Sequence, residues 1–139
     1  MKVTDRVYYL AALALQGVAL VLEMLPIGAV MVFATSSTER TIEVYSYFSM
    51  LPVGYANFAP LLTGILTILI ILLGVIALFR FDKAASIRRT IFVCSIISLL
   101  FSIVPVFLFG TVGMTAASYA VSCAILLSNC LQAVANRQE

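Results

Sequence analysis

Three long segments with almost no charge restrict what this chain can fold into. Residues 44–79 and 90–136 contain no Asp, Glu, Lys or Arg, and residues 7–38 contain only Glu23. An α-helix needs about 20 predominantly apolar residues to cross a bilayer. Only 10% of the 139 residues are charged and 63% are hydrophobic, whereas a soluble domain carries about 25% charged residues. The sequence therefore predicts an all-α integral membrane protein.

The length of each segment predicts how many helices it forms. The first segment predicts one long span with a kink at Pro26, because a proline ring clashes with the preceding helical turn. The second predicts a span that begins at Pro60, since the first helical position does not need an N–H. The third is about twice as long as one span, so we expect it to fold back on itself. The predicted single domain has spans over residues 7–34, 60–79, 90–109 and 114–135, an outer loop over 35–59, a basic loop over 80–89 and a tight outer turn over 110–113.

The distribution of basic residues predicts the orientation of these four spans. With a cytoplasmic N-terminus, Arg40 alone lies outside, and the inside holds Lys2, Arg6, Arg80, Lys83, Arg88, Arg89 and Arg137. Basic residues favour the cytoplasmic side of a membrane, so we expect both termini in the cytoplasm and the protein in a plasma or inner membrane. We also expect contacts with anionic lipid headgroups from Arg80, Lys83, Arg88 and Arg89.

The outer loop is rich in aromatic residues, which are Tyr45, Tyr47, Phe48, Tyr55 and Phe58. Residues 42–50 predict a short interfacial helix or a strand pair lying on the bundle. Amphipathic rings prefer the headgroup level of a bilayer, so one interpretation is an aromatic anchor. The other interpretation is a surface for a partner protein.

Small and polar residues recur at spacings of three and four in every predicted span. The sets are Ala12, Gln16, Ala19, Glu23 and Pro26; Thr63, Thr67, Ile70, Gly74 and Ala77; Ser95, Ser98, Ser102 and Pro105; and Thr115, Ser118, Ser122, Ile125, Asn129 and Gln132. This spacing places each set on one helix face. In lipid, small residues allow close helix approach, and hydroxyl and amide groups bond across helices. We therefore expect an antiparallel, up-down, left-handed four-helix bundle with a polar centre.

Glu23 is the charged residue that this arrangement must accommodate. A carboxylate in hydrocarbon is costly unless it is paired, and the predicted spans contain no Lys or Arg. We expect Glu23 to be protonated, or to face a water-filled cavity. Its predicted neighbours at the same depth are Thr63, Thr67, Ser102 and Ser118, while Gln16, Ser95, Ser98, Asn129 and Gln132 lie deeper. The candidate proton or ligand site comprises Glu23, Gln16, Thr63, Thr67, Ser102, Ser118, Ser122 and Asn129.

Two functions from different classes fit this sequence. The first is a non-catalytic accessory, assembly or contact protein, which acts through its bundle and aromatic outer loop on another membrane protein or a second copy. Its layout resembles that of tetraspan and claudin-like proteins, although the loop lacks their Cys and Trp. The second is an oligomeric, proton- or cation-coupled transporter or channel that uses Glu23. Its layout resembles that of small multidrug-resistance transporters, which also carry a glutamate in the first helix.

An enzyme is the least favoured class. The chain has no His, and its cysteines, Cys94, Cys123 and Cys130, all lie in apolar segments without C-x-x-C spacing. Cys94 and Cys130 fall at similar depths on adjacent predicted helices, but packing residues are the simpler interpretation. We expect no catalytic residues, no metal, no cofactor and no nucleic-acid partner.

Overall fold

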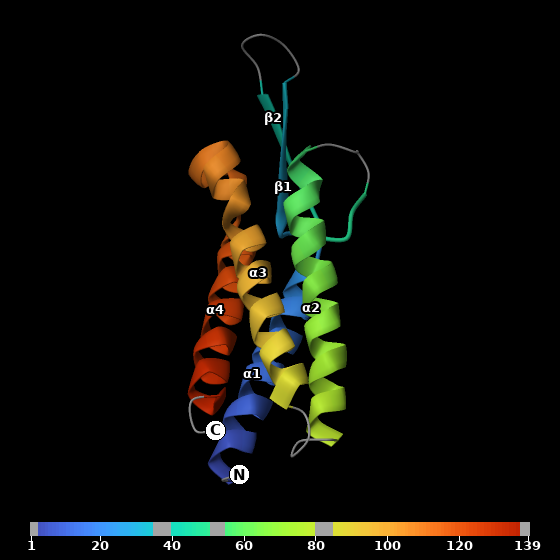
Figure 1. The fold of residues 1–139 in the computed structure, drawn as a ribbon. Coiled ribbons are helices and arrows are strands. Elements are labelled where there is room, and N and C mark those ends of the chain that lie inside the picture. Colours follow the sequence, from blue (N-terminus) through green and yellow to red (C-terminus); the bar gives the residue numbers. More distant parts are fainter. Residues whose placement is uncertain (1–2, 35–39, 51–54, 80–84, 137–139) are drawn as a thin grey trace.

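The computed structural model describes residues 3–34, 40–50, 55–79 and 85–136 (Figure 1). In chain order the elements are α1 (Val3–Met24), β1 (Ala29–Ala34), β2 (Arg40–Tyr45), α2 (Tyr55–Phe79), α3 (Ala85–Phe109), the short 3₁₀ helix η2 (Gly110–Gly113) and α4 (Ala116–Asn136). All four α-helices are long and apolar enough to cross a membrane. The prediction of a four-helix membrane protein is therefore confirmed.

The four helices form an up-down bundle (Figure 1). The largest helix contacts are between α1 and α4 and between α2 and α3, and smaller contacts join α3 to α4 and α1 to α2. The first residues of α1 and the last of α4 lie at one end, here called the inner end. The β1–β2 hairpin lies at the opposite, outer end. The left-handed twist, and the side of the membrane that each end faces, stay predictions.

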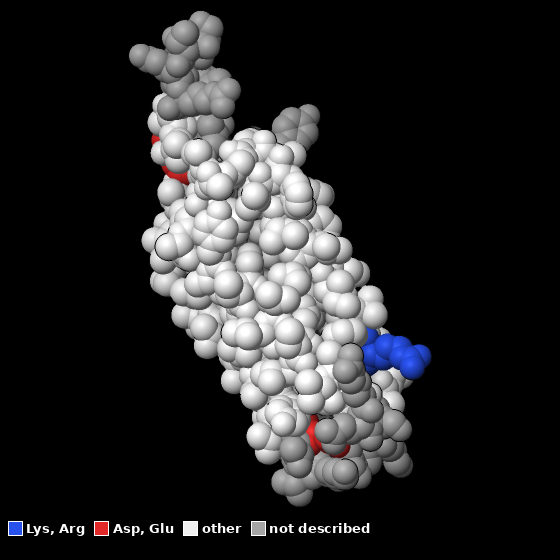
Figure 2. Space-filling view, turned by 90° about the vertical axis from the view of Figure 1, so that its left-hand side faces the viewer, with Lys and Arg blue, Asp and Glu red and all other residues white. Residues whose placement is uncertain are grey.

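The outside of the bundle is apolar. Large side chains at least 50% exposed include Leu10, Val21, Leu72, Leu100 and Leu127. On the face shown in Figure 2, charged atoms lie toward the two ends and the surface between them is uncharged. Soluble proteins rarely expose apolar patches of such extent. Lipid is the solvent that suits this surface, so the protein is embedded in a membrane.

The predicted first span, residues 7–34 with a kink at Pro26, is wrong in its outer third. Helix α1 ends at Met24, residues 25–28 form a turn, and Ala29–Ala34 is strand β1. Proline disfavours helical geometry in the residue before it and supplies no N–H of its own. Pro26 therefore ends the helix instead of kinking it, and its side chain is exposed. The following sequence, AVMVFA, includes β-branched and aromatic residues that suit a strand.

The outer loop contributes the second strand of the hairpin. Strands β1 and β2 pair antiparallel, with Ala29 opposite Tyr45 and Ala34 opposite Arg40. The strand-pair alternative for this region is thus the correct one. However, half of the pair comes from residues that the sequence pattern had placed in the first span, and the second strand begins and ends earlier than residues 42–50.

Two helices also begin earlier than predicted. Helix α2 starts at Tyr55, so Pro60 lies inside the helix and not at its first position. Helix α3 starts at Ala85, so the described part of the predicted basic loop is helical. At the other end of α3, Gly110 adopts a positive φ of 68°, a conformation that glycine adopts without steric cost. This glycine begins η2, which leads into α4.

The sets of small and polar residues face the centre of the bundle. Buried members are Ala12, Gln16, Ala19 and Glu23 on α1; Thr63, Thr67, Ile70, Gly74 and Ala77 on α2; Ser95, Ser98 and Ser102 on α3; and Ser118, Ser122, Ile125, Asn129 and Gln132 on α4. Pro26 is exposed, and Pro105 and Thr115 are half-buried. The three-and-four spacing therefore identified the buried face of every helix.

Candidate functional site

Glu23 is fully buried near the outer end of α1. Its Oε1 lies 2.9 Å from Thr67 Oγ1, which in turn lies 3.0 Å from the carbonyl oxygen of Thr63. A hydroxyl has one hydrogen and cannot donate to both oxygens. A protonated Glu23 resolves this, because it donates to Thr67 while Thr67 donates to Thr63. An ionised Glu23 would leave a buried charge whose Oε2 has no hydrogen-bond partner in the described part of the chain, so the geometry favours the neutral acid.

Tyr47 covers Glu23 from the outer end. Its backbone N–H donates to the Glu23 carbonyl oxygen over 3.0 Å. Its ring is 3% exposed and lies against Gly28, where a Cβ would come within 2.8 Å of the ring. Burial raises the pKa of the Tyr47 hydroxyl, because the phenolate would be poorly solvated. Glu23 is therefore enclosed by a neutral aromatic side chain.

The turn at residues 25–28 is tied to the start of α4. Thr115 Oγ1 donates to the Ile27 carbonyl oxygen over 2.7 Å, and the Ser118 hydroxyl donates to the Gly28 carbonyl oxygen. One turn further in, Ser122 Oγ donates to Ser102 Oγ over 3.0 Å and joins α4 to α3. The bonds from Thr115 and Ser118 satisfy backbone carbonyl groups of the turn that follows α1.

The residues predicted to surround Glu23 therefore fall into two separate groups. Thr67 contacts it directly, and Thr63 contributes a carbonyl to the same chain of hydrogen bonds, while its own hydroxyl donates to Ala59. We call Glu23, Tyr47, Thr63, Thr67, Ser102, Ser118 and Ser122 the outer cluster. Gln16 and Asn129, which were predicted to lie deeper, belong to a second group.

That second group centres on Ser128, which is fully buried. Ser128 Oγ donates to the Ala12 carbonyl oxygen over 2.9 Å. It accepts from Gln16 Nε2 at 3.2 Å and from Gln132 Nε2 at 3.1 Å. Sequence analysis missed Ser128, although Ile125, Ser128 and Gln132 continue the three-and-four spacing of α4.

Ser95 on α3 completes this inner cluster. Its hydroxyl accepts from Gln16 Nε2 at 2.9 Å, and its carbonyl accepts from Asn129 Nδ2 at 3.3 Å. The inner cluster thus comprises Gln16, Ser95, Ser128, Asn129 and Gln132, and it links α1, α3 and α4. The apolar residues Ala19, Val121 and Ile125 pack together along the same buried faces.

Two charged residues lie buried toward the inner end. Asp5 is 1% exposed and Arg88 is 4% exposed, and the charge of Arg88 acts on the buried Tyr9. The prediction that Arg88 contacts headgroups is therefore wrong, whereas Arg89 is exposed. Both buried charges continue the spacing of their helices, which could have revealed them. The other two predicted headgroup contacts, Arg80 and Lys83, lie outside the described residues.

The aromatic residues of the outer loop do not form one surface. Tyr47 is buried, which corrects its assignment to a partner surface, and Phe48 packs its ring over Gly64 of α2. The Tyr45 hydroxyl bonds to the Glu43 carboxylate, and this bond raises the pKa of Tyr45. Phe58 is 64% exposed, and the side chain of Tyr55 lies outside the described part of the structure.

The three cysteines form no disulfide with one another. Cys94 is half-buried, and Cys123 and Cys130 are exposed on the apolar outside of α4.

Comparison with protein-family models, with curated proteins and with solved structures found no match. The function must therefore be argued from the geometry of the two clusters and the hairpin.

Proposed function

We propose that this chain is a non-catalytic accessory, assembly or contact protein of the membrane, and that it acts through its outer hairpin on another membrane protein. The observation that carries the proposal is a hairpin that is fixed to the bundle yet leaves apolar side chains exposed. Ile42 and Val44 lie two residues apart on one face of β2 and are 52% and 40% exposed. Such side chains need a cover, either lipid or protein.

The attachment of the hairpin supports this role. Ala29 and Met31 of β1 are each 2% exposed, and Ala29 bridges to Met114 beside η2. Together with the carbonyl bonds from Thr115 and Ser118, these contacts hold the base of the hairpin in one orientation. A preorganised surface loses less conformational entropy when it binds a partner.

The proposal is tested with a photo-crosslinking amino acid placed at Ile42 in cells that express the full chain. We expect a discrete protein adduct at this position. Leu72, which is similarly exposed but lies on the lipid-facing side of α2, is the matched control and should give lipid adducts alone. Equal behaviour at the two positions would contradict a protein partner at the hairpin.

A proton- or cation-coupled transporter is the second candidate, and one observation favours it. Among the described residues, the Oε2 atom of Glu23 is buried without a hydrogen-bond partner, which leaves one acceptor position open for a cation or a donor ligand. This candidate ranks second because Glu23 is enclosed by Thr67 and Tyr47. A pH-gradient flux in proteoliposomes that the Glu23→Gln variant abolishes would reverse the ranking.

A further inference from the structure

Strand β1 is covered on both faces, whereas strand β2 is open on both. Successive side chains of a strand point to opposite faces of the sheet. Ala29, Val30 and Met31 follow one another in β1 and are 2%, 5% and 2% exposed, so both faces of β1 are packed, and α2 and η2 contact this strand. In β2, residues 41–44 are all exposed. The second strand therefore lies at the surface of the hairpin.

The outer edge of β2 carries main-chain groups that no described strand pairs. The sheet consists of β1 and β2, and the described residues pair no third strand with β2. Every second N–H and C=O along β2 therefore points away from β1. Such an edge is a template for a further strand, and many proteins protect it with a proline or a β-bulge. Residues 40–45 contain no proline, and their register with β1 is continuous.

The side chains of β2 indicate which strand would fit this edge. Ile42 and Val44 are exposed on one face, and Glu43 is exposed on the other, where Tyr45 donates to its carboxylate. Side chains opposite each other on neighbouring strands stabilise a sheet when both are apolar or when their charges are opposite. A fitting strand therefore has apolar side chains on the face of Ile42 and Val44 and a basic side chain beside Glu43.

A second copy of this chain does not fit the same edge. Two copies in one membrane have the same orientation, so a two-fold axis that relates them runs along the membrane normal. The hairpin extends in the direction of the helices (Figure 1), so this axis would place the two β2 strands parallel and exchange their faces. Parallel pairing keeps equivalent faces on one side of a sheet. Glu43 would also lie at the same height as Glu43 of the other copy, and like charges oppose pairing.

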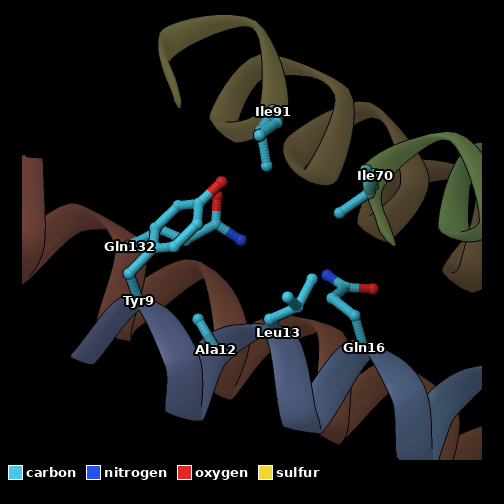
Figure 3. A pocket seen from close by; sticks show the side chains of 7 residues that line it. All are labelled: Tyr9, Ala12, Leu13, Gln16, Ile70, Ile91 and Gln132. Atoms are coloured by element: carbon cyan, nitrogen blue, oxygen red, sulfur yellow. The ribbon is translucent and has the colours of Figure 1, made fainter. Parts of the chain in front are cut away.

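The cavity at the inner cluster is too small to hold part of a partner. Tyr9, Gln16 and Gln132 are among the residues that line it, and the amide nitrogens of both glutamines are directed toward it (Figure 3). The space open to the centre of a water molecule is about 10 Å³, which is close to the smallest volume that holds one water. The edge of β2 is therefore the better candidate for binding a partner.

We propose that β2 receives an extended segment of another protein as a third strand, through main-chain hydrogen bonds along its outer edge. This inference rests on the proposed contact function and specifies how the partner is held. The segment covers Ile42 and Val44 with apolar side chains and places a basic side chain beside Glu43.

Proline substitution distinguishes main-chain bonding from side-chain contact. Single prolines are placed at Ile42, Glu43 and Val44 of the full chain in cells, with a photo-crosslinking amino acid at the exposed Thr41. Proline has no N–H, and an edge strand tolerates it where the lost N–H faces outward. Valine has a similar size and keeps the N–H, so Ile42→Val, Glu43→Val and the native Val44 are the matched controls.

The prolines should divide into two sets, because successive N–H groups of a strand alternate in direction. Where the lost N–H faced β1, the hairpin opens and the β1 amides exchange quickly with solvent. Where it faced outward, the β1 amides stay protected, and we expect the protein adduct to fall about ten-fold relative to valine, the effect of one or two main-chain bonds. Equal adduct yields for valine and such a proline would overturn strand addition but leave the contact function intact. Absence of any protein adduct in the native chain would contradict the contact function itself.

A second measurement leaves the main chain unchanged. The photo-crosslinking amino acid is placed at Ile42 and then at Val44, and the residues modified in the partner are identified by mass spectrometry. An added strand predicts adducts about two residues apart in one segment of the partner. Adducts in unrelated segments, or an adduct of this chain with its own copy, would overturn the proposal.

Discussion

Replacement of Glu23 by glutamine tests whether the buried acid is neutral. A glutamine retains a donor at the position of Oε1, so it can donate to Thr67 as the protonated acid does. It adds one N–H that the protonated acid does not have. We expect Glu23→Gln to lower the free energy of unfolding by about 1 kcal/mol or less.

Replacement of Glu23 by alanine removes both the hydrogen bond and the packing of the side chain. The unfolded chain stays in an apolar solvent, so the loss lies mainly in the bond and in the cavity, not in transfer to water. We expect Glu23→Ala to cost about 2–3 kcal/mol. The assay is reversible unfolding in mixed micelles, followed by circular dichroism as denaturing detergent is added. If glutamine costs as much as alanine, the native residue is a carboxylate whose charge contributes to stability, and Thr67 donates to it.

Three further predictions concern other parts of the molecule. Gly64→Ala should lower the free energy of unfolding by about 1–3 kcal/mol, because the new Cβ would lie 2.8 Å from the Phe48 ring. The control is Gly17→Ala, where a Cβ would meet no atom within 4 Å, and it should be neutral or stabilising in the same unfolding assay. Arg88→Ala should destabilise by more than 1 kcal/mol, whereas exposed Arg89→Ala should stay within about 0.5 kcal/mol, and similar losses would contradict the burial of Arg88. Stability should fall as pH rises above about 10, because Tyr47 ionises in the unfolded chain but not when buried; unfolding midpoints measured across this range should change less in Tyr47→Phe.

The buried faces of the helices could be predicted from the sequence because, in lipid, polar side chains mark the face that contacts other helices. Polar side chains such as those of Gln16, Ser98 and Asn129 are costly to expose to lipid, so they face the other helices. Their spacing along each helix therefore identifies its buried face. The same spacing extended to Arg88 would have shown that this arginine is buried. Its position in a basic segment favoured the headgroup interpretation instead.

The hairpin could not be predicted in the same way. Hydropathy does not distinguish the apolar strand Ala29–Ala34 from the end of a membrane span, because Val, Met, Phe and Ala serve both. Only the partner strand and the carbonyl bonds to the Ile27–Gly28 turn decide between them, and both depend on residues distant in sequence. Pro26 was the local signal, and it fits a helix end as well as a kink.

The length of the hairpin determines how far a partner protein must extend to contact all of it. Strand β2 has six residues and is about 20 Å long. Its partner β1 contacts α2 and η2, and the far end of the hairpin stands beyond the helices (Figure 1). A protein wholly immersed in lipid could reach the base of this strand pair but not its far end. Any partner that grips the whole of β2 must therefore carry a segment that rises out of the bilayer to the same height.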